Sequence, residues 1–213
     1  QLGLGNDISN ILVITKINKY LCKFGYKNID IRTNFSVITT SDDKLYFIGE
    51  NDKGQLNIHE KTSMDYLRIN KDNIRCKKVI CGNNHTLMLD YDNKLYGWGN
   101  NEYGQLGLGV ISIVEELTEI VFTENIIIKD ILCGDNHSIL IDDSNNMYVC
   151  GDNQYGQLGL GVNDTAITTF TKVNNNFDIY KWAVGSNHTI LISENRDYYV
   201  CGDNQYGQLG LGV

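Results

Sequence analysis

The heptapeptide Tyr103-Gly104-Gln105-Leu106-Gly107-Leu108-Gly109 recurs along this chain at a nearly fixed period. It returns unchanged at residues 155–161 and 206–212, its tail opens the chain at residues 1–5, and a degenerate copy occupies residues 53–59. The matched glutamines, at positions 1, 55, 105, 157 and 208, are separated by 54, 50, 52 and 51 residues. Self-similarity at a period near 50 residues indicates a repeat architecture.

Two further motifs keep the same phase. One reads Cys81-Gly82-Asn83-Asn84-His85-Thr86, returns at 133–138 and 184–189, and is degenerate at 31–36, where Phe35 replaces the histidine. The other reads Leu95-Tyr96-Gly97-Trp98-Gly99, with equivalents at 45–49, 147–151 and 198–202. Three motifs in register define four copies, at approximately 6–56, 57–109, 110–161 and 162–213. We expect residues 1–213 to form a single propeller domain or part of one.

Each copy has the pattern of β-strands. The apolar run Thr86–Leu89 is followed by the polar turn Asp90–Asn93 and then by Leu95 and Tyr96, which predicts a hairpin. Further β-rich pieces, such as Glu119–Phe122 and Ile126–Ile128, lie upstream of the next histidine motif. A small sheet of three or four strands cannot bury both faces alone, and radial stacking of such sheets gives an all-β propeller. We therefore expect almost no helix.

The repeated residues are candidates for structural or chemical roles. A buried histidine that ties backbone groups together is favoured at His85, His137 and His188 over a three-histidine metal site. The Ser or Thr after each histidine is a poor nucleophile candidate, because adjacent strand residues point to opposite faces. The glycine-rich loops are not followed by the Lys and helix of a phosphate site. The glycines are thus predicted to be architectural: Gly82, Gly134, Gly185, Gly104, Gly156 and Gly207.

The charge of the chain is uneven. The net charge is −8, which argues against non-specific nucleic-acid binding. Residues 1–109 carry 14 basic and 12 acidic residues, a net of +2, whereas residues 110–213 carry 4 and 14, a net of −10. A basic cluster would favour an acidic partner, and an acidic cluster a basic one, unless both only keep the protein soluble. The basic cluster is Arg68, Lys71, Arg75, Lys77 and Lys78; the acidic cluster is Glu115, Glu116, Glu119 and Glu124.

The remaining composition narrows the class of protein. Six cysteines, four of them at equivalent repeat positions, suit small buried residues in a reducing compartment better than a disulfide framework or a zinc site. No apolar run reaches the length of a membrane span, and no secretory signal is visible. We expect an intracellular protein, cytoplasmic or nuclear, with no metal, cofactor or catalytic residue. Because the chain begins with Gln1 inside a repeat, we expect a fragment or a processed product.

The three motifs together resemble the regulator of chromosome condensation repeat, over essentially the whole chain. The resemblance implies a β-propeller of usually seven blades, of which about four are present here. Members of that family include an exchange factor for the small GTPase Ran that also binds nucleosomes, domains of ubiquitin ligases, and scaffolds. The exchange factor depends on an inserted β-wedge, for which the repeat spacing leaves no room, so no exchange residue is carried over. We expect a non-catalytic protein–protein interaction scaffold, the alternatives being an exchange factor for a Ran-like GTPase and a chromatin-associated module.

Overall fold

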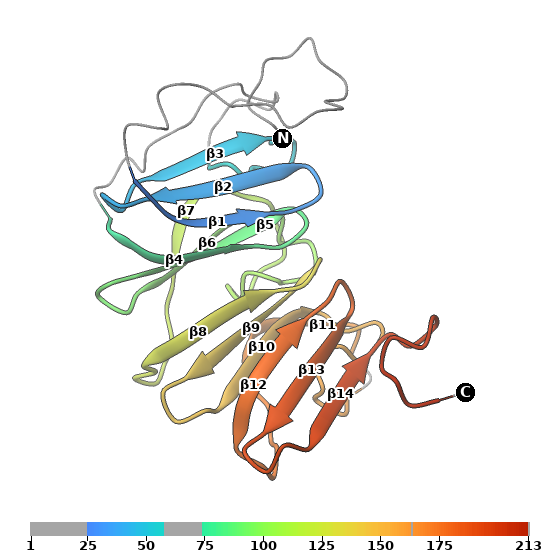
Figure 1. The fold of residues 1–213 in the computed structure, drawn as a ribbon. Coiled ribbons are helices and arrows are strands. Elements are labelled where there is room, and N and C mark those ends of the chain that lie inside the picture. The colour runs from blue at the N-terminus through green and yellow to red at the C-terminus, as the bar shows by residue number, and fades with distance from the viewer. Residues whose placement is uncertain (1–24, 58–73, 163, 213) are drawn as a thin grey trace, which may run out of the picture.

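The computed structural model describes residues 25–57, 74–162 and 164–212, and these residues form only strands, turns and loops (Figure 1). The fourteen strands of the described residues are β1 (Tyr26–Ile31), β2 (Phe35–Thr40), β3 (Leu45–Gly49), β4 (Cys76–Cys81), β5 (His85–Asp90), β6 (Leu95–Gly99), β7 (Val114–Ile120), β8 (Ile128–Cys133), β9 (His137–Asp142), β10 (Met147–Asp152), β11 (Ala166–Lys172), β12 (Ile179–Val184), β13 (His188–Ser193) and β14 (Tyr198–Gly202). No helix in this part of the chain could span a membrane.

The strands form four antiparallel sheets in chain order. Sheet 1 is β1-β2-β3, sheet 2 is β4-β5-β6-β7, sheet 3 is β8-β9-β10-β11 and sheet 4 is β12-β13-β14. The first strand of each sheet contacts the first strand of the next, so the sheets follow one another in an arc whose inner side these strands line (Figure 1). This arrangement confirms the prediction of an all-β propeller with four blades in the chain.

The sheets do not coincide with the sequence copies. β7 belongs to the copy that starts at residue 110, yet it pairs with β6 of the preceding copy, with Leu95 opposite Ile120. β11 pairs in the same way with β10, and Tyr148 lies opposite Lys172. Glu119 and Ile120 therefore end the outermost strand of sheet 2 and do not begin sheet 3. Each four-stranded sheet takes three strands from one copy and its outermost strand from the next.

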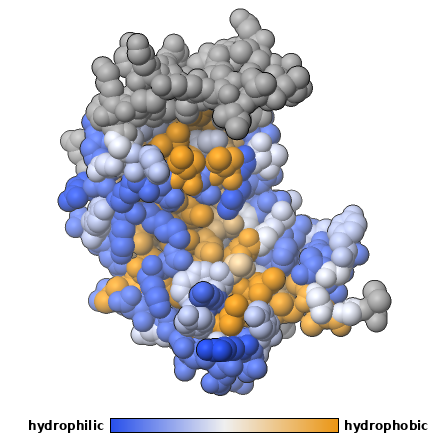
Figure 2. All heavy atoms as spheres, in the orientation of Figure 1, coloured by the Kyte–Doolittle hydropathy of each residue, from blue (hydrophilic) through white to orange (hydrophobic). Residues whose placement is uncertain are grey.

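The hydrophobic core lies between successive sheets as three clusters. Between sheets 1 and 2, the rings of Phe47 and Trp98 meet edge to face, with 5.7 Å between centroids. Phe35, which stands where the other copies have histidine, is fully buried in this cluster. Burying one such side chain contributes roughly 1.5–3 kcal/mol, so the sheets stabilise one another through these layers. On the face shown in Figure 2, hydrophobic side chains reach the surface over β1, where Ile29 and Ile31 are exposed.

The hairpin turns of sheets 2 and 3 are fixed by an aspartate at the end of the second strand. The carboxylate of Asp90 accepts hydrogen bonds from the backbone N–H groups of Asp92 (2.9 Å) and Lys94 (2.8 Å). Asn93 between them adopts φ = 65°, a left-handed conformation that Asn tolerates better than most residues. Asp142 holds the equivalent turn of sheet 3 by accepting from the N–H of Asn146 at 2.8 Å. These turns keep the second and third strands in register.

Candidate functional site

The glycine-rich loops are held by their own side chains. The Gln105 side-chain oxygen accepts from the backbone N–H of Tyr103 at 2.9 Å, and Asn101 Oδ1 accepts from the N–H of Leu106 at 2.9 Å. Gln55, Gln157 and Gln208 repeat the first bond in the other copies. Gln105 and Leu106 are fully buried, so the middle of this loop is part of the core.

The same glutamines link each sheet to the next through their backbone carbonyls. The carbonyl of Gln105 accepts from Ser138 Oγ at 2.7 Å and from Cys150 Sγ at 3.4 Å, both in sheet 3. The carbonyl of Gln55 accepts from Trp98 Nε1 at 2.9 Å in sheet 2. The loop and the hairpin therefore keep a nearly constant spacing along the chain because the loop of one copy forms hydrogen bonds with the hairpin of the next.

The histidines lie in the same contact layer. His85 Nε2 lies 2.9 Å from Ser138 Oγ, whose own proton goes to the Gln105 carbonyl, so the ring nitrogen donates. Burial, with smaller contributions from His137 and Arg32, lowers the pKa of His85 to about 3. Burial likewise lowers the pKa of His137 to about 4, and neither of its ring nitrogens has a hydrogen-bond partner within the described residues. His188 is only half-buried.

The buried pair of His85 and Ser138 does not have the arrangement of a catalytic dyad. Both residues have no exposed surface, and the serine proton is directed at a backbone carbonyl and away from the histidine. Burial raises the pKa of Cys133 to about 12 and that of Cys76 to about 12, which makes both thiols unreactive. Across the described ranges, His, Cys, Asp and Glu side chains form no group of three that could hold a metal ion.

The motif glycines fall into two classes with different causes. At Gly134, a Cβ atom would lie 2.1 Å from Cε1 of the His137 ring and 2.8 Å from the carbonyl of Gly185. Gly82 and Gly185 stand in the same relation to His85 and His188. Gly156, in contrast, has φ = 74° and open space around the position of a Cβ. The first class is required for close packing on a histidine, and the second for a left-handed backbone.

The two charged clusters lie at opposite edges of sheet 2. Lys77 and Lys78 are on β4 at the inner edge, with Arg75 just before them, whereas Glu115, Glu116 and Glu119 are on the outermost strand, β7, with Glu124 in the loop that follows. Arg68 and Lys71 lie outside the described residues.

Several members of these clusters already have partners. Arg75 forms an ion pair with Asp43 (3.0 Å), Lys78 with Asp130, and Glu119 with Lys94 (3.2 Å). Within the described residues, Lys77, Glu115 and Glu124 are exposed and form no ion pair. These three side chains are therefore the cluster members best placed to meet a partner.

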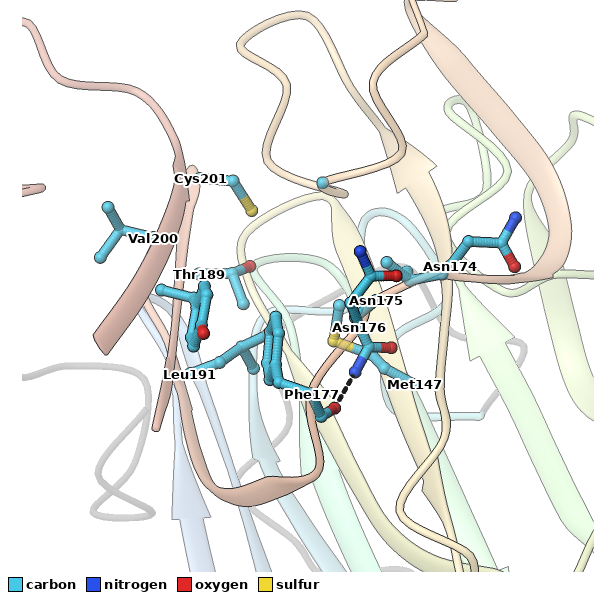
Figure 3. A pocket seen from close by; sticks show the side chains of 12 residues that line it. Met147, Asn174, Asn175, Asn176, Phe177, Thr189, Leu191, Val200 and Cys201 are labelled. Carbon is cyan, nitrogen blue, oxygen red and sulfur yellow. Dashed lines mark hydrogen bonds between the residues drawn. The ribbon is translucent and has the colours of Figure 1, made fainter. Parts of the chain in front are cut away.

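A cavity of about 470 Å³ lies between sheets 3 and 4 (Figure 3). Met147, Leu191 and Cys201 line it from the strands, and the loop Asn174–Phe177 borders it on the other side. The Phe177 ring stacks on Tyr199 with 3.6 Å between centroids, and Asn175 Nδ2 donates to the Phe177 carbonyl at 2.5 Å. The sequence analysis did not single out this cavity, because Tyr199 occupies a position where Tyr96 and Tyr148 are core residues.

Profiles described as the regulator of chromosome condensation (RCC1) repeat match this chain in every described sheet but the first. One matches residues 76–105, 128–157 and 181–208, and a second matches residues 92–141 and 144–192. Together they cover residues 76–208 without a gap, which is more than half of the chain. The chain belongs to the RCC1 repeat family.

Two curated relatives match this RCC1-repeat chain over less than half of its length. The human X-linked retinitis pigmentosa GTPase regulator is 42% identical over 82 residues, which are 38% of this chain and 8% of the relative. The mouse secretion-regulating guanine nucleotide exchange factor is 36% identical over 85 residues, which are 39% of this chain and 18% of the relative. This chain therefore spans only a small part of these proteins.

Solved structures share the fold over most of the chain. Prp20p from Saccharomyces cerevisiae superposes with a TM-score of 0.80 at 22% identity, over 90% of this chain and 48% of Prp20p. Human WBSCR16 gives a TM-score of 0.78 at 20% identity, over 88% of this chain and 50% of that protein. At these identities the likeness concerns the RCC1 propeller fold alone, and the chain corresponds to about half of each propeller.

Proposed function

We propose that this RCC1-repeat chain is a non-catalytic scaffold for protein–protein interactions. The observation that carries the proposal is the separation between repeated and non-repeated residues. The motif residues Gln105, His85 and Trp98 are fully buried in contacts between sheets, where no partner can reach them. The exposed charged side chains, in contrast, differ from copy to copy. Variable groups on a rigid framework are where binding residues collect.

The exposed charged residues give this scaffold two surfaces of opposite character. Glu115 and Glu124 lie on and beside the outer strand of sheet 2 and suit a basic partner, whereas Lys77 on the inner strand suits an acidic one. Glu115, Glu124 and Lys77 are exposed and form no ion pair within the described part of the chain. A partner could therefore contact these side chains without first breaking an ion pair. An exposed charge pair adds little affinity by itself, but charge complementarity selects partners and speeds their encounter.

Charge reversal with matched controls tests the scaffold proposal. The double variant Glu115→Lys and Glu124→Lys is compared with Asp143→Lys and Asp164→Lys, which make the same charge change at exposed positions elsewhere. Similarly, Lys77→Glu is compared with Lys172→Glu on β11. In pull-downs from the native host, the cluster variants should lose partners that the controls retain. An unchanged set of partners for both cluster variants would contradict the charged-surface proposal.

A guanine nucleotide exchange role is the second candidate. It is supported by the similarity to the mouse secretion-regulating guanine nucleotide exchange factor, and by the fold shared with Prp20p, whose structural study concerns binding to Gsp1p and histones. The test is release of labelled GDP from a Ran-like GTPase with and without the protein. Faster release would favour exchange, whereas release at the intrinsic rate would favour the scaffold.

A chromatin-associated module is the third candidate. The net charge of −8 suits basic histones better than DNA. Pull-down with histone octamers and with free DNA in parallel separates the two modes, because only the first is expected to recover the protein.

A further inference from the structure

One exposed position in the turn between the second and third strands differs in charge from sheet to sheet. It directly follows the residue whose N–H donates across the turn, and it holds Ser41, Tyr91, Asp143 and Glu194 in sheets 1 to 4. Sheets 3 and 4 therefore carry a negative charge at this position, whereas sheet 2 carries the neutral hydroxyl of a tyrosine.

Two cations face the ring of Tyr91. Lys27 Nζ lies 4.6 Å from the ring centroid and donates a hydrogen bond to the Tyr91 hydroxyl oxygen at 2.5 Å. The guanidinium carbon of Arg75 lies 4.8 Å from the same centroid. Cations are attracted to the face of an aromatic ring, so these contacts hold the side chain in place. Tyr91 is nevertheless 49% exposed, in a sheet that has all four of its strands.

The charges in contact with this side chain do not balance. Asp43 Oδ1 accepts a hydrogen bond from Lys27 Nζ at 2.7 Å, and Asp43 Oδ2 accepts one from Arg75 Nη2 at 3.0 Å. One carboxylate therefore serves two cations, which leaves one positive charge in excess beside a neutral hydroxyl. An additional anionic group on Tyr91 would meet donors that are already in place.

The other charged groups of the turn do not remove this excess. The carboxylate of Asp90 accepts from the backbone N–H groups of Asp92 and Lys94, and Lys94 forms its ion pair with Glu119. Asp92 is exposed and is the acidic side chain of the turn that would oppose a further negative charge. Two cations in contact with the tyrosine outweigh one exposed carboxylate, because exposed charges are strongly screened.

We infer that Tyr91 is a phosphorylation site, and that Lys27 and Arg75 bind the phosphate formed there. A protein tyrosine kinase and ATP supply the phosphoryl group. The hydroxyl of Tyr91 loses its proton and its oxygen bonds to the γ-phosphorus, while the bond from that phosphorus to the β,γ-bridging oxygen breaks and ADP leaves. The phosphate carries a charge of about −1.5 to −2 and three acceptor oxygens, which suit the ammonium and guanidinium donors.

The modification would link two sheets and reverse a local charge. Lys27 lies on β1 of sheet 1, whereas Tyr91 belongs to the β5–β6 turn of sheet 2. A phosphate shared by Lys27 and Arg75 would therefore add a contact between the sheets and turn an excess of positive charge into an excess of negative charge. This inference goes beyond the scaffold function and does not depend on it.

Phosphate binding is tested first, without a kinase. Phosphotyrosine is incorporated during translation at position 91 of the 213-residue protein and, as a control, at position 155. Tyr155 is 44% exposed, and no cation faces its ring within the described residues. A titration followed by phosphorus NMR gives the second pKa of each phosphate, which is ordinarily about 6. We expect about 6 at position 155 and about 5.5 or lower at position 91, because the cations favour the dianion.

Two variants identify the cause of that difference. The double variant Lys27→Met and Arg75→Met should return the phosphate at position 91 to the pKa found at position 155. Asp43→Asn should lower the pKa at position 91 further, because the competing carboxylate is gone. Loss of structure would move the pKa in the opposite direction, so this variant separates phosphate binding from an effect on folding.

The kinase reaction is tested on the unmodified protein. It is incubated with ATP and the catalytic domain of a tyrosine kinase of broad specificity, and phosphotyrosine is located by tandem mass spectrometry. We expect phosphate on Tyr91. Three results would each overturn the inference: equal phosphate pKa values at positions 91 and 155, a value at position 91 that Asp43→Asn leaves unchanged, and a kinase reaction in which Tyr91 acquires no phosphate.

Discussion

Replacing Gly134 by alanine should destabilise this protein far more than the same change at Gly156. Both glycines belong to repeated motifs, and both substitutions add one methyl group. At Gly134 that group would lie 2.1 Å from Cε1 and 2.4 Å from Nδ1 of His137, and 2.8 Å from the carbonyl oxygen of Gly185. Carbon atoms in contact normally sit about 3.5–4.0 Å apart, so the ring would have to move by more than about 1 Å.

The magnitude follows from how little the surroundings can yield. His137 is fully buried. The neighbouring Gly185 carbonyl belongs to the inner edge of sheet 4. The turn at that edge is held to the equivalent turn of sheet 3, because the N–H of Asp135 donates to the carbonyl of Ser186 at 3.0 Å. Forcing extra volume into a well-packed site costs typically 1–3 kcal/mol, and we expect Gly134→Ala to cost about 3 kcal/mol. The methyl group of Gly156→Ala would meet no atom of the described residues. Only the left-handed φ of 74° opposes this substitution, and it should lower the free energy of unfolding by about 1 kcal/mol.

The assay is urea unfolding followed by far-ultraviolet circular dichroism. The free energy of unfolding of each variant is compared with that of the unaltered protein. The double variant Gly134→Ala with His137→Ala identifies the cause, because removal of the ring should recover part of the loss caused by the methyl group.

Equal costs at Gly134 and Gly156 would refute this reasoning, as would strict additivity of Gly134→Ala and His137→Ala. Either result would mean that backbone conformation, and not contact with the histidine ring, explains the glycine at position 134.

Three further outcomes are expected in the same assay. His85→Gln should flatten the pH dependence of the free energy of unfolding. Burial lowers the pKa of His85 to about 3 from an ordinary 6.5, so the neutral ring contributes its full stabilisation above pH 6.5. Below that pH, the contribution of His85 to the free energy of unfolding falls by up to about 1.4 kcal/mol per pH unit as the pH drops toward 3. Unfolding curves at pH 7, 5.5 and 4.5 check this, and parallel slopes in both proteins would exclude it. Trp98→Phe should cost about 1–2 kcal/mol, since the bond from Nε1 to the buried Gln55 carbonyl is lost; an unchanged urea midpoint would count against the link between sheets. Lys94→Met should change stability by less than about 0.5 kcal/mol, because its ion pair with Glu119 is exposed; a larger loss would show that this pair is structural.

The sequence predicted the number and type of sheets, because three motifs in one phase locate a hairpin in every copy. It did not predict which sheet receives the strand after each glycine-rich loop. The segment Val114–Ile120 has apolar residues only at Val114, Leu117 and Ile120, and this pattern does not distinguish β6 from β8 as its neighbour. The choice depends on where the loop 103–109 directs the chain, which a local pattern does not record.

The candidate residues show the same limit. The motif analysis interpreted the histidines and glycines as architectural but did not distinguish the causes that act at different glycines. The requirement at Gly134 depends on the place of the His137 ring, which follows from tertiary packing. The hydrogen bond from His85 to Ser138 joins residues 53 positions apart, so it could not be read from either motif alone.

The offset between copies and sheets has a consequence for how such a protein can change in length during evolution. A 52-residue copy such as residues 110–161 brings an outer strand for the sheet before it and three strands for a sheet of its own. Tandem duplication of one copy would therefore complete the old sheet and leave the new one ready for the strand that already follows. Insertion or loss of a whole copy alters the number of blades without exposing a sheet edge at the junction. Genes of this kind can lengthen or shorten by one copy while every sheet at the junction keeps its strand pairing.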